Sequence, residues 1–216
     1  LGSHRAIVID TGPDPELIDR CLKQLGIREI PLLIITHGHA DHIAGLPGVK
    51  KGRIIKQTWY QNVKQGTQAE IESDRGKVKI EVLWPDSGSY DPNNSSIAVR
   101  ITTKDYSLFA GGDMEPLTQS VIAPTMRAVD IYKVCHHGSA YQDQLFTRAL
   151  SPQVAMISVG AGNSYGHPAP ATLELLAQAG AKVLRTDRDG AIAISARNHR
   201  LKVRTSKSKL TFLRWE

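Results

Sequence analysis

Four potential metal ligands lie within six consecutive residues of this chain: His37, His39, Asp41 and His42. They directly follow the apolar run of residues 32–35, which is typical of a buried strand. Imidazole and carboxylate groups bind zinc, manganese, iron or nickel. We expect His37 and His39 to take one ion and Asp41 and His42 a second. A surface loop with scattered histidines is the alternative, but six of the eight histidines fall in three short motifs.

Further side chains with metal or acid–base chemistry follow other apolar runs. Asp113 comes after a predicted strand and the small pair Gly111-Gly112, which lets the backbone approach a ligand closely. His136 and His137 follow another predicted strand, and His167 lies between a strand and a helix. Loops at the carboxyl ends of strands are the usual place for functional groups in α/β proteins.

The spacing of apolar and turn-forming residues predicts strands interleaved with helices in both halves of the chain. We expect strands over residues 5–10, 78–83, 97–101, 106–110, 131–135 and 154–159, and helices over residues 15–26, 114–123, 142–150 and 169–179. Asp14 is the predicted cap of the first helix. Asp189-Gly190 is predicted to form a hairpin turn.

Seven motifs, in this order, resemble the metallo-β-lactamase superfamily and, more narrowly, the soluble carboxyl-terminal domain of the bacterial competence DNA-internalisation channel (ComEC) family. They are residues 9–13, 37–42, 92–96, 111–114, 133–139, 165–168 and 185–190. The His-x-His-x-Asp-His motif marks only the broad superfamily, whereas Asn-Ser-Ser, His-His-Gly-Ser and Gly-His-Pro together are more specific. The resemblance implies an α/β fold of the αββα sandwich type, with two mixed sheets face to face and helices outside. It also implies that residues 1–216 form a single domain.

The resemblance also assigns roles to individual residues. It implies two divalent ions, Mn²⁺ or Zn²⁺, held by His37, His39, Asp41, His42, Asp113 and His136. Asp113 bridges the ions in this scheme, and Asp41, His137 and His167 take part in catalysis. Asp10, Asn94 and Ser96 orient the ligands from behind. His136 is preferred over His137 as ligand because strand alternation places it opposite Cys135, which then faces the core.

Each of these roles has a structural alternative. Asp113 can cap a helix, Asp10 can form a turn with Gly12, and His167 can be an ordinary loop residue. The superfamily usually has one more histidine before the bridging aspartate, but residues 43–112 contain none. The corresponding segment is residues 93–96, whose neutral oxygens bind zinc weakly and suit Mn²⁺ better. The same residues can simply form the turn into the next strand.

The composition and net charge of the chain indicate which class of protein it belongs to and which kind of partner it binds. The length and ordinary apolar content fit one globular domain, and no apolar run approaches the roughly 18 residues of a membrane span. The formal net charge of +6 indicates an acidic partner. Basic residues gather near the carboxyl terminus, at Arg197, Arg200, Lys202, Arg204, Lys207, Lys209 and Arg214. Such residues also protect exposed edge strands from aggregation.

Taken with the resemblance, these features predict a metal-dependent deoxyribonuclease that acts on the non-transported strand during DNA uptake. Its partners would be DNA and the membrane channel portion of a longer parent protein, with no small organic cofactor. We expect the chain to be a piece of a bacterial membrane protein that lacks the family's first strand and faces outside the cytoplasm. The alternatives are a small-substrate hydrolase of the same superfamily and a non-catalytic DNA-guiding module with a degenerate metal site.

Overall fold

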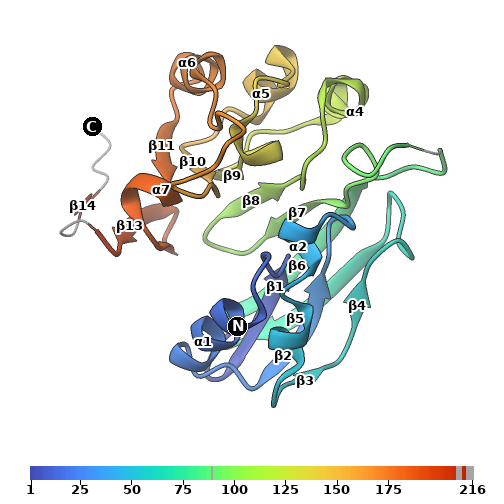
Figure 1. The fold of residues 1–216 in the computed structure, drawn as a ribbon, viewed down its shortest axis with the longest axis vertical. Helices are drawn as coiled ribbons and strands as arrows, with labels where there is room; N and C mark the ends of the chain where they lie inside the picture. Colours follow the sequence, from blue (N-terminus) through green and yellow to red (C-terminus); the bar gives the residue numbers. More distant parts are fainter. Residues whose placement is uncertain (89, 208–210, 213–216) are drawn as a thin grey trace. The chain divides into compact units, whose positions relative to one another are not determined.

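The computed structural model describes residues 1–88 and 90–207 and the backbone of residues 211–212. The chain divides into two compact units, Leu1–Val99 and Arg100–Glu216, and the boundary falls within strand β7 (Ala98–Thr102). Figure 1 shows several sheets and helices along the chain, which confirms the predicted α/β class. Lys209 and Arg214, two of the basic residues singled out above, lie outside the described residues.

Unit 1 is built around a small parallel sheet in which β2 pairs with β1, β3 and β4. Its elements are β1 (Arg5–Ile9), α1 (Pro15–Gln24), β2 (Glu29–Ile34), α2 (Ala40–Ile43), α3 (Leu46–Lys50), β3 (Ile54–Ile55), β4 (Thr58–Trp59), β5 (Gln68–Ser73) and β6 (Gly76–Trp84). Strands β5 and β6 form an antiparallel hairpin. Val8, Leu22, Leu33 and Val49 belong to one buried core cluster, so α1 and α3 pack on the parallel sheet.

Helix α1 begins where the sequence predicts and ends at Gln24, two residues before the expected end at Gly26. The Asp14 carboxylate accepts hydrogen bonds from the amides of Glu16 and Leu17, and Pro15 occupies the first turn. Gly26, with φ of 68°, follows the helix end and takes the left-handed conformation that favours glycine. This helix therefore follows from local sequence alone.

Unit 2 contains a parallel sheet with the strand order β8-β9-β10-β11. Its elements are β8 (Ser107–Ala110), α4 (Pro116–Ile122), η1 (Ala123–Thr125), β9 (Ile131–Lys133), η2 (Cys135–Gly138), α5 (Gln144–Leu150), β10 (Val154–Ile157), α6 (Pro170–Gln178), β11 (Lys182–Arg185), α7 (Thr186–Asp189), β12 (Ile192–Arg197), β13 (Arg200–Thr205) and β14 (Thr211–Phe212). The last three strands form a separate antiparallel sheet with β13 in the middle.

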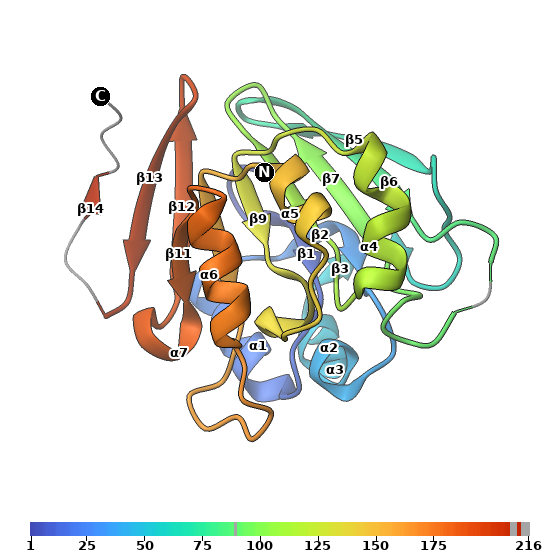
Figure 2. The same ribbon diagram turned by 90° about the horizontal axis from the view of Figure 1, so that it is seen from above.

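The parallel sheet of unit 2 is covered on both faces. Figures 1 and 2 show α4, α5 and α6 on one side of it, and there Phe146 of α5 packs against the rings of Phe109 and Tyr132. On the other side, Leu201 and Val203 of β13 belong to the core cluster that also contains residues of β9, β10 and β11. Successive strand residues point to opposite faces, which lets one short strand serve both layers.

Two local predictions are wrong. The strand expected over residues 131–135 ends at Lys133, and residues 135–138 form the 3₁₀ helix η2. Asp189-Gly190 ends helix α7 and makes no hairpin turn. The turn between β12 and β13 is instead Asn198-His199, where both residues have the positive φ that a two-residue hairpin of type I′ requires.

Among the described residues, no helix is both long enough and apolar enough to cross a membrane. The expectation of one domain over residues 1–216 stays a prediction.

Candidate metal centre

In unit 1, the predicted ligands gather at the carboxyl ends of two parallel neighbours, β1 and β2. Asp10 directly follows β1, and the ligand loop of residues 37–42 follows β2. His39 is the residue before helix α2, and Asp41 and His42 lie within it. Because parallel strands end at a common edge, residues 27 or more positions apart in the sequence meet there.

Asp10 orients His42 directly. Its Oδ2 lies 2.8 Å from His42 Nδ1, and its Oδ1 accepts a hydrogen bond of 2.8 Å from the backbone amide of Thr36. A carboxylate only accepts hydrogen bonds, so His42 Nδ1 carries the hydrogen and Nε2 carries the lone pair. Nε2 in turn lies 3.7 Å from Asp41 Oδ2. A carboxylate behind a histidine in this way is the usual support of a metal ligand.

His37 is held by two hydroxyl groups. Its Nδ1 lies 3.2 Å from Thr36 Oγ1 and 3.3 Å from Ser96 Oγ, and all three residues are buried. The Thr36 hydroxyl also lies 3.0 Å from the Asp10 carboxylate, to which it donates. Its remaining lone pairs then accept the hydrogen of His37 Nδ1. This arrangement leaves the lone pair of His37 on Nε2, on the opposite side of the ring.

His37 and His39 fit a shared ion. His37 Nε2 lies 3.1 Å from His39 Nδ1. Two nitrogens at this separation can both reach one ion at bond lengths of about 2.0–2.1 Å. The donor chemistry of this pair therefore fits the divalent metal that the motif predicts.

Asn94 and Ser96, both predicted to support the ligands, have different contacts. Asn94 holds its own turn: its side-chain amide donates to Asp91 Oδ2 at 2.8 Å, and its backbone carbonyl accepts from the Trp84 indole. Ser96 reaches His37, as described above. The segment 93–96 thus combines a turn with one direct contact to a predicted ligand.

In unit 2, the predicted site residues follow three adjacent parallel strands. Asp113 comes after β8, His136 and His137 after β9, and His167 after β10. Gly111 allows this packing, because a Cβ there would lie 2.7 Å from the Cys135 sulfur. The carboxyl edge of the sheet therefore collects one carboxylate and three imidazoles.

His137 lies closer to Asp113 than His136 does. Asp113 is buried, and its Oδ2 lies 3.5 Å from His137 Nε2 and 4.0 Å from His136 Nε2. His137 Nδ1 donates to the Ser158 carbonyl at 2.7 Å, whereas His136 Nδ1 lies 3.1 Å from Glu115 Oε1 without forming a hydrogen bond to it. Both histidines therefore turn Nε2 toward Asp113.

The reason for preferring His136 over His137 as ligand is corrected by the backbone. Strand alternation does not apply to residues 135–138, where His136 and His137 have φ values of 48° and 50°. Cys135 is nevertheless buried, and burial raises the pKa of its thiol to about 12. It is therefore a protonated core residue. The assignment of His136 as ligand stays a prediction, with His137 as a second candidate from geometry.

His167 lies beside the other two histidines of unit 2. Its ring centroid is 5.6 Å from that of His136, and the ring of Tyr165 stacks on it with a centroid distance of 5.9 Å. Burial lowers the pKa of His167, and the nearby His136 and His137 lower it further. The neutral imidazole is therefore favoured, which can donate or accept a hydrogen bond.

Thr36 and Glu115 contact predicted ligands but were not identified from the sequence. Thr36 directly precedes the first ligand histidine, and this adjacency is a signal that sequence analysis could have used. Glu115 carries no such signal, because its contact with His136 joins residues 21 positions apart. Within unit 1, Asp41 and His42 have ligand atoms close enough to share an ion, and within unit 2 the same holds for Asp113 and His137.

Comparison with known proteins agrees with the motifs. A sequence model of the metallo-beta-lactamase superfamily matches residues 2–160. ComE operon protein 3 of Bacillus subtilis is 32% identical over 200 residues, which cover 80% of this chain and 25% of that protein. Competence protein ComA of Neisseria gonorrhoeae is 27% identical over 203 residues, or 88% of this chain and 29% of that protein. These findings confirm the predicted resemblance and the fold class.

The chain spans about a quarter of the length of the curated relatives it matches. The solved structure of a metallo hydrolase from the archaeon Ignicoccus hospitalis also aligns, with 16% identity, a TM-score of 0.47 and coverage of 72% of this chain and 76% of that chain.

Proposed function

The chain belongs to the metallo-beta-lactamase superfamily, and on this premise we propose that it hydrolyses phosphodiester bonds of DNA with two divalent ions, Mn²⁺ or Zn²⁺. The observation that carries the proposal is the arrangement of the imidazoles. His37, His42 and His137 each have the nitrogen Nδ1 engaged by a hydroxyl, carboxylate or carbonyl group, which presents Nε2 as a ligand atom. Three imidazoles fixed in this orientation suit a metal centre, in which the ring nitrogen away from the metal is normally held by such a group.

The proposed ligand set follows the family resemblance. His37 and His39 hold the first ion and Asp41 and His42 the second. Asp113 would serve both ions, as the resemblance implies, and His136 or His137 would complete the set. Where the superfamily usually has a further histidine, this chain has the segment 93–96, in which the Ser96 hydroxyl contacts His37. A first ion with fewer imidazole ligands favours Mn²⁺ over tightly held zinc.

Two bound divalent ions activate a water, screen the charge of the phosphate and stabilise the leaving oxygen. The residues of the chain have supporting tasks. Asp10 and Thr36 hold the rings of His37 and His42, so the ligand atoms need no reorganisation when substrate binds. His167 donates a hydrogen bond to a phosphate oxygen; the alternative role, a proton given to the leaving oxygen, needs the protonated ring, which the lowered pKa of His167 disfavours.

DNA is the proposed substrate because of the net charge of the chain and the names of its relatives. The net charge of +6 suits a polyanion, and the relatives named above are a protein of the ComE operon and a competence protein. We further propose that this domain faces outside the cytoplasm of a bacterial cell as part of a longer membrane protein. There it would act on the strand that is not taken up.

The test is cleavage of labelled single- and double-stranded DNA by the purified protein with Mn²⁺, Zn²⁺ or a chelator. Asp113→Ala and His39→Ala should abolish metal-dependent products. His4→Asn is the control, because His4 is exposed, lies outside the motifs and has a positive φ that asparagine tolerates. Undiminished cleavage by the two site variants would contradict the proposal.

Two other functions remain as outcomes of the same experiment. A small-substrate hydrolase would cleave chromogenic phosphate esters or lactones faster than DNA under identical metal conditions. A DNA-guiding module would bind DNA in a salt-sensitive way without any turnover. We favour the nuclease because the proposed ligand set provides for two ions, which phosphodiester hydrolysis uses, whereas a DNA-guiding module with a degenerate site holds at most a structural ion.

A further inference from the structure

The hairpin formed by β12 and β13 has one apolar face and one basic face. Its apolar face is packed: Ala196, Leu201 and Val203 are buried in the core of unit 2. The alternate positions are exposed, and these carry all the cations of the two strands. They are Arg197, Arg200, Lys202 and Arg204, which we call the hairpin cations.

Within the two strands, the hairpin cations share their face with small side chains. In the register of the hairpin, Arg197 is opposite Arg200, Ser195 is opposite Lys202, and Ala193 is opposite Arg204. Neither β12 nor β13 contains an aspartate or a glutamate. Four positive charges on twelve strand residues thus supply most of the formal net charge of +6 of the whole chain.

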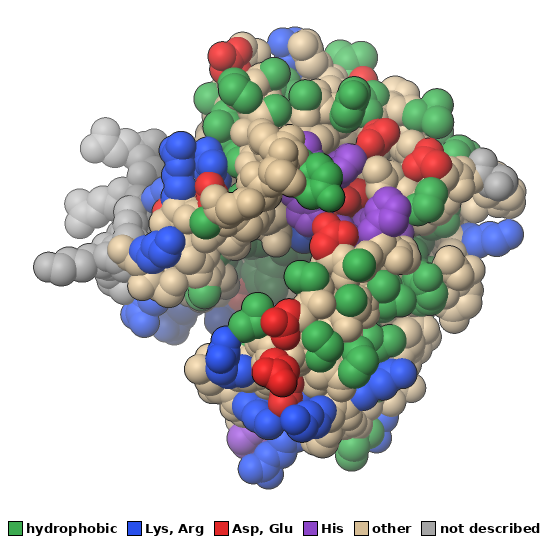
Figure 3. Space-filling model, in the orientation of Figure 1, with side chains coloured by type: hydrophobic (Ala, Val, Ile, Leu, Met, Phe, Trp, Pro, Cys, Tyr) green, Lys and Arg blue, Asp and Glu red, His purple; other side chains and the backbone are tan. Residues whose placement is uncertain are grey.

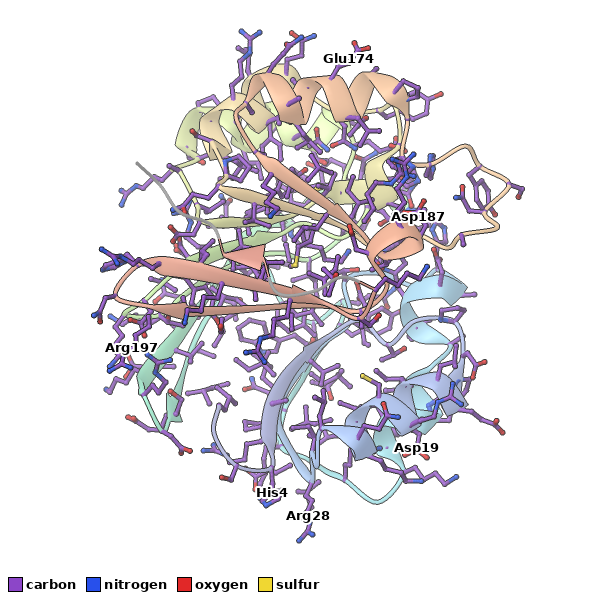
Figure 4. The ribbon with its side chains drawn as sticks, turned by 90° about the vertical axis from the view of Figure 1, so that its left-hand side faces the viewer. His4, Asp19, Arg28, Glu174, Asp187 and Arg197 are labelled. Atoms are coloured by element: carbon purple, nitrogen blue, oxygen red, sulfur yellow. The ribbon has the colours of Figure 1, made fainter. Side chains whose placement is uncertain are left out.

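Several basic residues elsewhere in the described part of the protein pair with acidic ones. On α1, Asp19 lies 2.8 Å from Lys23 and 3.0 Å from Arg53, and Figure 3 shows blue and red side chains gathered in the region of this helix. In unit 2, Arg185 pairs with Asp187 at 2.6 Å; Figure 4 labels Asp19, Asp187 and, on the hairpin, Arg197. The two strands of the hairpin differ from these regions because their charged residues are all of one sign.

Protection of an edge strand does not account for the hairpin cations. Lysine and arginine on an edge strand prevent pairing with other chains. Three of the four cations, however, lie on β13, which is the middle strand because it pairs with β12 on one side and β14 on the other. Because β14 pairs with β13 at Lys202 and Val203, Lys202 has no open edge to protect, and edge protection does not explain why all four cations share one face.

The arrangement also costs stability. Like charges directly opposite each other on neighbouring strands repel, and Arg197 and Arg200 form such a pair. A bound polyanion removes this repulsion. Along β13 the cations recur at every second residue, about 6.8 Å apart, so they form a regular row of positive charge on one surface.

We propose that the hairpin cations form a binding surface for the phosphate backbone of DNA. The choice of DNA rests on the proposed function, whereas the surface itself rests on the charges and the register. The two strands contain no aromatic residue on which bases could stack. Binding is therefore directed at phosphates, independent of base sequence and strongly dependent on salt.

The test is fluorescence anisotropy with labelled single-stranded oligonucleotides of several sequences, measured in EDTA over a series of salt concentrations. The variant carries Arg197→Gln, Arg200→Gln, Lys202→Gln and Arg204→Gln. The control carries Arg20→Gln, Arg28→Gln, Lys50→Gln and Lys56→Gln, four exposed cations of unit 1, and has the same net charge. Thermal melting checks that both proteins fold.

We expect the hairpin variant to bind all sequences more weakly and to the same degree. The slope of log K against log salt should become shallower by about 0.7 for each phosphate of a single strand that the protein no longer neutralises. A second variant with Arg197→Lys, Arg200→Lys and Arg204→Lys keeps the charge and should bind nearly as wild type does. Equal affinity and slope in the hairpin variant and the control would overturn the proposal.

Two further outcomes are decisive. If the hairpin variant keeps DNA binding but loses binding to vesicles of phosphatidylglycerol, the surface serves an anionic membrane and the proposal is wrong. Because EDTA prevents metal-dependent cleavage, the result is independent of the nuclease assay. Binding without cleavage by the wild-type protein with metal would refute the nuclease and leave this surface intact. Cleavage by the wild-type protein, together with unchanged DNA binding by the hairpin variant, would support the nuclease and refute this binding surface.

Discussion

The hydroxyl group of Thr36 contacts three predicted site residues of unit 1, namely Asp10, His37 and His42. Its hydroxyl lies 3.0 Å from both carboxylate oxygens of Asp10 and 3.2 Å from the Nδ1 atoms of His37 and His42. One hydroxyl hydrogen can serve only one of these acceptors at a time, and the ionised carboxylate is the strongest. His42 Nδ1 gives its hydrogen to the Asp10 carboxylate, as described above, and His37 Nδ1 donates to the Thr36 oxygen, which sets the tautomer of the His37 ring.

Replacing Thr36 by valine tests this role, because valine has a similar shape but no hydroxyl. We expect the affinity for Mn²⁺ or Zn²⁺, measured by calorimetric titration, to fall about 10- to 100-fold. Thr36→Ser should restore much of it. Thr147→Val is the matched control, since Thr147 is also buried and bonded through its hydroxyl, to the Asp143 carbonyl. Equal metal affinity in the Thr36→Val and Thr147→Val proteins would exclude a specific role for Thr36.

His136 and His137 can be distinguished by the same titration. His137 Nε2 lies 3.5 Å from Asp113 Oδ2, against 4.0 Å for His136. We therefore expect His137→Ala to weaken metal binding more than His136→Ala does. The opposite order would support the assignment made from the motif. Glu115→Gln should resemble His136→Ala only if His136 is a ligand, because the Glu115 carboxylate lies 3.1 Å from that ring.

At the scale of elements, α1 and α3 approach closely because Gly48 has no side chain. A Cβ at this position would lie 1.8 Å from the Pro15 carbonyl oxygen. Helix α3 follows directly from the ligand loop and α2, so this contact also anchors the chain beyond the predicted ligands. Helix propensity favours alanine over glycine by about 1 kcal/mol, whereas the close packing of α1 on α3 disfavours any side chain at position 48.

Packing should prevail in Gly48→Ala. We expect a net loss of stability of about 1–3 kcal/mol, the usual cost of an overpacked core position. Urea unfolding followed by circular dichroism gives the value. Gly160→Ala is the control, because no atom lies within 4 Å of a Cβ there and its φ is not positive. A stabilised Gly48→Ala protein would show that α1 and α3 can separate without cost.

At the scale of the whole molecule, metal binding should stabilise the folded chain. The ligand atoms are brought together only by folding, so an ion binds the native state far better than the unfolded one. At a free concentration 100 times the dissociation constant, one bound ion adds about 2.7 kcal/mol. We expect the melting temperature to rise with Mn²⁺ or Zn²⁺ and to return to its starting value with a chelator.

His39→Ala should reduce this increase, because it removes one nitrogen of the pair that lies 3.1 Å apart. His4→Asn should melt like the wild type in both conditions. A melting temperature that is the same with and without metal would refute metal binding by the folded protein. That result would also remove the basis for the proposed nuclease.

Much of this protein follows from sequence because its signals are local. The cap Asp14, Gly26 after α1 and the glycines before Asp113 specify backbone conformation within a few residues. The ligand loop can also be predicted from local sequence, since His37 to His42 come in one short segment after an apolar strand. The family and fold class followed from the order of such segments, and the match of the superfamily model to residues 2–160 confirms them.

Contacts between distant residues were decided by the tertiary structure. The end of β9 at Lys133 overturned the alternation argument for His136, because left-handed backbone at residues 136–137 is set by packing and not by the apolar pattern. Glu115 meets His136 through the fold, and Ser96 meets His37 across 59 residues. Likewise, the sequence determined that the carboxyl-terminal strands are basic. Only their pairing showed that β13 is a middle strand, because hydrogen bonding to neighbours on both sides is a property of the assembled sheet.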